Sequence, residues 1–129
     1  MSKKEAKELS SASDFIKSYA TKEMTLENPK RVIEIQTLPI LDFAPLTLIL
    51  SEEQQLLHCV QVAKKAILSP LVRNSLTKKE YYGLTHEEIL IKEYEIFKES
   101  NKFSDTDIKQ ICAEVAKFSA ETRDKAAEV

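Results

Sequence analysis

Apolar residues repeat at helical spacing through the second half of the chain. The broadest stripe lies in residues 52–68, where apolar side chains surround most of the helix, and this predicts a central helix buried on more than one side. Narrower stripes predict two further helices, over 85–100 and 105–118. The central stripe is carried by residues spaced four, three and four apart: Leu56, Val60, Ala63 and Ile67.

Each of these stripes begins at a helix-start signal. A Ser or Thr is followed three residues later by Glu, Asp or Gln, so that the hydroxyl and the longer side chain can cap backbone N–H groups reciprocally. A fourth signal predicts a brief helical turn that ends at Gly83, where glycine can adopt a positive φ. The four predicted starts are Ser51–Gln54, Thr77–Glu80, Thr85–Glu88 and Ser104–Asp107.

The N-terminal part of the chain predicts a tail and a short helix. Residues 1–9 are charged and lack any apolar period, so we expect a disordered tail there. A helix is predicted from the serine cluster at 10–13 to about Met24, before Asn28-Pro29. Its apolar stripe consists of Phe15, Ile16, Tyr19 and Ala20.

Residues 25–50 are the most apolar part of the chain, and their sequence does not predict a continuous helix. Pro29, Pro39 and Pro45 interrupt any continuous helix. The β-branched run in 31–37 and the alternation in 46–50 favour short strands, with a turn at Ala44-Pro45 as one option. An extended segment that wraps the helical core is one interpretation. The other is that a second protein covers part of it.

The combined pattern predicts a mainly α fold. We expect a small bundle of about four helices with one extended apolar segment at residues 30–50, with short β-strands as an option. Residues 10–129 form one helical domain, because 129 residues suit a single core. Large apolar residues are absent between Phe118 and the last residue, which predicts a solvated final stretch from about residue 119.

Composition excludes several function classes. The chain has one glycine, so glycine-rich phosphate loops cannot form. Its 19 Lys and Arg against 21 Asp and Glu argue against a dedicated binder of the DNA backbone. No leader pattern or membrane-length apolar run is visible, and both cysteines fall within apolar helical patterns. We therefore expect an intracellular protein, cytoplasmic or nuclear, without a disulfide and without a membrane partner.

Candidate catalytic and metal-binding residues do not form recognisable constellations. The histidines and cysteines are not spaced so that they could chelate a metal together. Neither cysteine has a cationic setting that would lower its pKa. The helix carboxylates are expected to be solvated. We therefore predict no catalytic residue, no cofactor and no metal. The residues considered were His58, Cys59, His86 and Cys112, with the carboxylates Glu87, Glu88, Glu93 and Glu95.

What remains is an interaction role. We predict a non-enzymatic protein–protein interaction subunit or adaptor of an intracellular assembly, bound to a protein partner or to itself. One alternative is a chromatin- or nucleic-acid-associated factor within a complex, using its lysine doublets although direct nucleic-acid contact is not expected. A second is a small enzyme using His86 and nearby carboxylates. The predicted partner-binding residues are Ile33, Ile35, Leu38, Ile40, Leu41, Phe43, Leu46 and Leu48.

Overall fold

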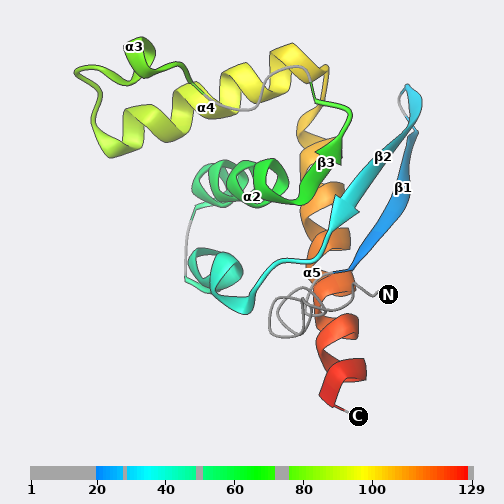
Figure 1. The fold of residues 1–129 in the computed structure, drawn as a ribbon. Helices are drawn as coiled ribbons and strands as arrows, with labels where there is room; N and C mark the ends of the chain where they lie inside the picture. The colour runs from blue at the N-terminus through cyan, green and yellow to red at the C-terminus, as the bar shows by residue number, and fades with distance from the viewer. Residues whose placement is uncertain (1–19, 28, 49–50, 72–75, 128–129) are drawn as a thin grey trace, which may run out of the picture.

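The computed structural model describes residues 20–27, 29–48, 51–71 and 76–127 (Figure 1). This part of the chain is mainly α-helical, as the sequence predicts, and it also carries a small three-stranded sheet. The predicted tail at 1–9 and residues 10–19 of the first predicted helix lie outside it. Its elements, in chain order, are β1 Thr21–Glu27, β2 Lys30–Gln36, the 3-10 helix η1 Ile40–Thr47, α2 Glu52–Ala66, β3 Ile67–Ser69, α3 Lys78–Tyr81, α4 His86–Asn101 and α5 Asp105–Ala127.

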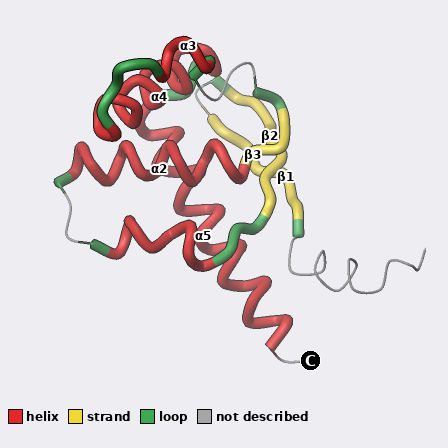
Figure 2. The backbone as a smooth tube through the Cα atoms, turned by 60° about the vertical axis from the view of Figure 1, so that its left-hand side comes forward, coloured by secondary structure: helices red, strands yellow, loops and turns green. Residues whose placement is uncertain are grey.

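Helix α2 is the centre of the fold. It contacts α5, α4, η1 and β3. It runs beside α4 and crosses the N-terminal half of α5, while the C-terminal end of α4 leads into the start of α5 (Figures 1 and 2). This arrangement confirms the central helix that the broad apolar stripe predicts. The helix ends at Ala66, two residues before the predicted end, because the chain continues as strand β3.

Strands β1 and β2 form an antiparallel hairpin, and β2 also pairs with β3. The first predicted helix is therefore wrong for residues 21–24. Met24 and Leu26 alternate with exposed neighbours and enter the core, which is the period of a strand with one buried face. The predicted strand at 31–37 is confirmed as β2.

Polar contacts join the two ends of this hairpin to each other and fasten it to α5. The Ala20 N–H donates to Thr37 Oγ1 at 3.0 Å, and the Leu38 N–H donates to the buried Ser119 Oγ at 3.0 Å. Lys22 pairs with Glu114 and lies over the Phe118 ring. Helix α5 continues past Phe118 to Ala127, with Ser119 buried and most side chains from 121 to 126 exposed.

The predicted strand at 46–50 and the turn at Ala44-Pro45 are wrong for the described residues. Ile40–Thr47 instead forms the 3-10 helix η1, with Pro45 inside it. The Asp42 N–H donates to the Pro39 carbonyl and the Leu48 N–H to the Pro45 carbonyl. These bonds have the three-residue period of a 3-10 helix, and Pro45 has no N–H group to donate.

The four predicted helix starts are confirmed. At each of them the Ser or Thr hydroxyl accepts the N–H of the residue three positions later, at 3.1 to 3.3 Å. At three of the starts the acidic side chain also accepts the backbone N–H of the capping residue. These reciprocal pairs are Thr77–Glu80, Thr85–Glu88 and Ser104–Asp107.

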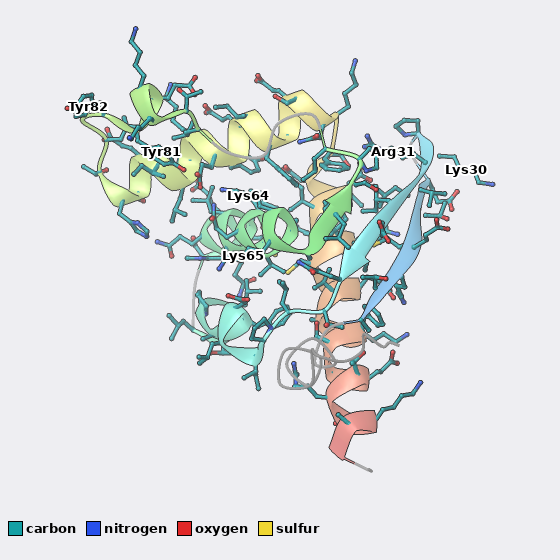
Figure 3. The ribbon with its side chains drawn as sticks, viewed as in Figure 1. Lys30, Arg31, Lys64, Lys65, Tyr81 and Tyr82 are labelled. Atoms are coloured by element: carbon teal, nitrogen blue, oxygen red, sulfur yellow. The ribbon has the colours of Figure 1, made fainter. Side chains whose placement is uncertain are left out.

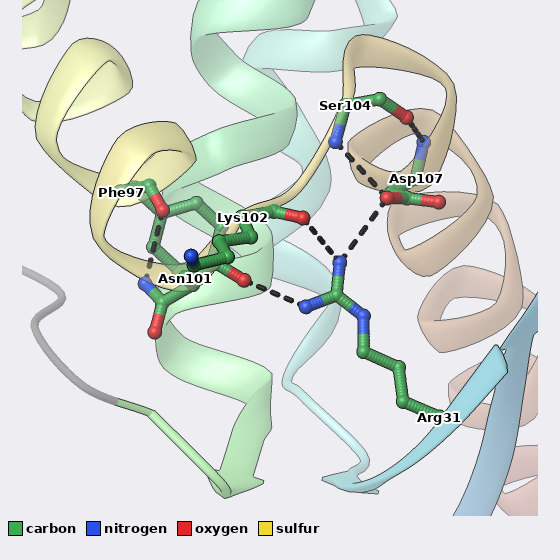
Figure 4. Close-up of polar contacts among 6 residues, drawn as sticks. All are labelled: Arg31, Phe97, Asn101, Lys102, Ser104 and Asp107. Atoms are coloured by element: carbon green, nitrogen blue, oxygen red, sulfur yellow. Dashed lines mark hydrogen bonds and ion pairs between the residues drawn. The ribbon is translucent and has the colours of Figure 1, made fainter. Parts of the chain in front are cut away.

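Arg31 joins strand β2 to the corner between α4 and α5 (Figure 4). Its guanidinium donates to the carbonyl oxygens of Asn101 and Lys102, and it pairs with Asp107 Oδ2 at 3.3 Å. The same group lies over the Phe103 ring, 4.6 Å from its centroid. One side chain therefore satisfies the carbonyl groups at the end of α4 and holds the start of α5.

The two positive-φ positions among the described residues permit a paired stability prediction. Gly83 has φ of 77°, and a Cβ added there would meet nothing within 4 Å, while Lys102 has φ of 56° at the end of α4. We expect Gly83→Ala to lower the free energy of unfolding by about 1 kcal/mol and Lys102→Gly to raise it by up to about 1 kcal/mol, because only glycine avoids the left-handed penalty. Urea denaturation checks both signs. A shift of the same sign in both variants would contradict this explanation.

Candidate interaction surface

The structure divides the eight predicted partner-binding residues into three groups. Ile33, Ile35 and Leu38 are at most 7% exposed and belong to the chain's own core. A partner cannot contact these side chains, so the prediction is corrected for them. The physical reason is that β2 alternates, and its apolar face is turned toward the helices.

Phe43 and Leu46 form the second group. Both are half-buried and pack against the core from η1, where their spacing of three places them on one side of a 3-10 helix. Asp42 lies on the neighbouring side and pairs with Lys65 Nζ of α2 at 3.0 Å. These contacts hold η1 against α2.

The third group remains accessible. Ile40 is 63% exposed, Leu41 79% and Leu48 60%. We call these three residues the η1 face. These three large aliphatic side chains lie within nine residues of the sequence, on or directly after an element that Phe43 and Leu46 anchor to the core. They are exposed among the described residues, and exposed apolar side chains of this size mark a candidate interface.

The lysine doublets differ in how many of their charges are paired, and Figure 3 labels the doublet of α2, Lys64 and Lys65. Lys64 pairs with Glu93 at 3.0 Å, and Lys65 pairs with Asp42, so the α2 doublet is neutralised within the fold. Lys78 and Lys79 on α3 make no ion pair within the described residues and lie beside Tyr82, which is 89% exposed. The doublet at 3–4 lies outside the described residues.

The prediction that Glu93 is a solvated helix charge is wrong. Glu93 is 3% exposed on α4, where its carboxylate accepts hydrogen bonds from Gln61 Nε2 at 2.9 Å and Tyr81 OH at 2.7 Å. With the ion pair to Lys64, both oxygens are satisfied. The signal in the sequence is its position four residues from both Ile89 and Phe97, on the inward stripe.

The ionisation of Glu93 is set by opposing effects. Burial would raise its pKa, but hydrogen bonds from Tyr81, Lys64 and Gln61 and the charge of Lys64 outweigh this and lower the pKa below its ordinary value. Folding therefore favours the charged carboxylate. The resulting stability is present above the pKa of the unfolded chain and is lost as the pH falls through the folded pKa.

Glu93→Gln should therefore show a pH-dependent effect. The variant removes the charge at nearly constant shape, and we expect it to be less stable than wild type by about 1–3 kcal/mol at neutral pH. The difference should shrink as the pH falls below about 4.5, the ordinary pKa of a glutamate. Urea denaturation across this range measures it. A difference that stays constant or widens at acid pH would contradict an ionised Glu93.

Cys59 of α2 and Cys112 of α5 lie close enough to interact, and their interaction shifts the two pKa values in opposite directions. The interaction with Cys112 and the charge of Lys109 lower the pKa of Cys59 against the opposing effect of burial. The interaction with Cys59 and burial raise the pKa of Cys112. The expectation that neither cysteine has a cationic setting is therefore wrong for Cys59.

This asymmetry predicts an order of alkylation. Because the thiolate is the nucleophile, iodoacetamide should modify Cys59 about tenfold or more faster than the buried Cys112. Lys109→Met should slow the reaction of Cys59, whereas Lys117→Met, an exposed change on the same helix, should not. Peptide mass spectrometry over time gives the two rates. Equal rates at both cysteines would contradict the assignment.

His86 is exposed at the first turn of α4 and lines a hollow of about 230 Å³ together with His58 and Glu87. Among the described residues, no hydrogen bond joins either imidazole to a carboxylate, and no three metal-ligating side chains converge. Every described helix is too short or too polar to cross a bilayer. Comparison with protein-family models, curated proteins and solved structures finds no match.

Proposed function

We propose that this protein is a non-enzymatic protein–protein interaction subunit whose partner covers the η1 face. The observation that carries the proposal is the exposure of Ile40, Leu41 and Leu48 on and directly after an element that Phe43 and Leu46 anchor to the core. An apolar patch of this kind is a common mark of a protein interface.

The energetics favour this use of the surface. Each aliphatic side chain that becomes fully buried contributes about 1.5–3 kcal/mol. The anchoring of η1 by Phe43, Leu46 and the Asp42–Lys65 pair fixes the patch before binding. A preorganised patch loses less conformational entropy when a partner docks, so more of the burial energy is available for affinity.

Site-specific photo-crosslinking in cells of the source organism tests this proposal. A photoreactive residue replaces Leu41, and the matched control places it at Lys117, an exposed position on α5. We expect a discrete protein adduct from position 41 and none of the same mass from position 117. The adduct should disappear when Ile40→Ser and Leu48→Ser are added. Identical adduct patterns at both positions, or none at position 41, would refute the proposed surface.

A second candidate function is supported by the tip of the molecule at α3. Lys78 and Lys79 lie beside the exposed ring of Tyr82, and lysines with an accessible aromatic ring suit the phosphates and bases of single-stranded nucleic acid. Binding of a labelled oligonucleotide that weakens steeply with salt and is lost in Tyr82→Ala would favour this candidate. No detectable binding at low salt would exclude it.

A further inference from the structure

A groove runs between α2 and α4, away from the η1 face. It consists of two adjoining hollows of about 440 and 230 Å³ that share Leu57. The apolar floor is formed by Leu56 and Leu57 of α2 and by Leu90 and Ile91 of α4. We call this feature the α2–α4 groove. Floors of this kind, lying between two parallel ridges, accept the apolar stripe of a third helix.

The rim of the groove is acidic on both sides. Glu52 and Glu53 rise from the first turn of α2, and Glu95 rises from α4. Asp105 lies at the end nearest α5, where hydrogen bonds from Tyr94 and Lys98 lower its pKa and the Lys98 ammonium balances its charge.

The remaining acidic charge is largely uncompensated. Lys109 is the lysine that lines the larger hollow, and its ammonium is 3.9 Å from the Glu52 carboxylate, a loose and exposed pair. Glu53 and Glu95 have no ion pair or hydrogen bond to another described side chain. Each side of the groove therefore carries one carboxylate without a balancing cation, Glu53 on α2 and Glu95 on α4.

We propose that the α2–α4 groove binds an amphipathic helix of a partner protein whose apolar stripe is flanked by lysine or arginine. The apolar stripe would cover the half-buried Leu56, Leu90 and Ile91, and the basic flanks would face Glu53 and Glu95. An acidic helix or a nucleic acid would place like charges along the rim, which selects against those occupants. This site is separate from the η1 face and does not depend on it.

Two designed helical peptides test the proposal directly. One carries leucines at helical spacing flanked by lysines, and the other has the same leucines flanked by glutamates. Fluorescence anisotropy with the full chain at low ionic strength should give saturable binding of the lysine peptide that weakens as salt is added. Failure of the lysine peptide to bind, or equal affinity for the glutamate peptide, overturns the proposal.

A charge-reversal pair locates the site. Glu53→Lys with Glu95→Lys should weaken the lysine peptide by about tenfold or more, because both rim charges are inverted. The matched control is Glu23→Lys with Glu121→Lys, which makes the same change in net charge at positions outside the groove. Circular dichroism confirms that both variants fold. Equal losses in the two variants would mean that only net charge is sensed, and the groove would be excluded.

The peptide measurement is also independent of the proposed function. A variant with Ile40→Ser, Leu41→Ser and Leu48→Ser should keep its affinity for the lysine peptide, since these side chains lie on η1 and the residue after it rather than on the groove walls. Loss of peptide binding in this variant would place the peptide on the η1 face and refute the groove.

Discussion

Phe97→Ala should lower the free energy of unfolding by about 3–5 kcal/mol, the largest effect expected of a single core truncation in this chain. The Phe97 ring is fully buried and packs on Phe103 with ring centroids 5.2 Å apart. Truncation removes the buried ring surface and leaves a cavity where α4 meets the corner with α5. Urea denaturation of the purified variant measures the loss.

Tyr82→Ala is the matched control for this prediction. It removes an aromatic ring from a side chain that is 89% exposed, so we expect a change within about 0.5 kcal/mol. If Phe97→Ala lowers the free energy of unfolding no more than Tyr82→Ala does, Phe97 does not anchor α4 in the core.

Arg31→Met should lower the free energy of unfolding by about 2–4 kcal/mol, because it removes a charged hydrogen-bond donor from three acceptors at once. The methionine keeps the apolar stem but leaves the Asn101 and Lys102 carbonyl groups without this donor and the buried Asp107 carboxylate without its cation (Figure 4). Thermal or urea unfolding gives the magnitude.

The neighbouring Lys30 provides the control for Arg31. Lys30→Met also removes a positive charge from β2, but from an exposed side chain, so its effect should stay within about 0.5 kcal/mol. The loss of stability in Arg31→Lys should fall between the losses in Arg31→Met and Lys30→Met, because one ammonium group cannot reach all three acceptors as the planar guanidinium does. Equal stability of the Arg31→Met and Lys30→Met proteins would contradict a stabilising role for the Arg31 contacts.

The sequence predicts the helices well because their signals are local. A hydroxyl and an acceptor three residues apart, as in Thr85–Glu88, define a helix start without reference to the rest of the chain. The inward stripe that follows places Phe97 in the core correctly. Gly83 likewise adopts the positive φ that its position after α3 requires.

Strand β1 is not predictable from the same local signals. The helical pattern that begins near Phe15 has no clear stop signal before Met24, so the sequence predicts a helix there. The strand becomes evident only when β2 is present as its pairing partner, as in the pairing of Met24 with Ile33. The β1–β2 connection at 28–29 forms without a glycine.

The polar and thiol contacts are missed for a related reason. Glu93 is buried because Gln61 and Lys64 approach from α2 and Tyr81 from α3, and no local window contains all four residues. Cys59 and Cys112 meet only when α2 packs on α5. For the interaction surface, the apolar pattern identifies the right segment, but only the structure separates the core side of β2 from the exposed side of η1.

Carbene footprinting tests the central claim, that a partner covers the η1 face, most directly. The purified chain and the same chain in a native extract of its source cells are labelled in parallel. We predict strong labelling at residues 40–48 in the purified chain and several-fold protection in the extract, with unchanged labelling at the exposed positions of 121–126. Equal labelling of residues 40–48 in both samples would contradict the proposed interaction surface.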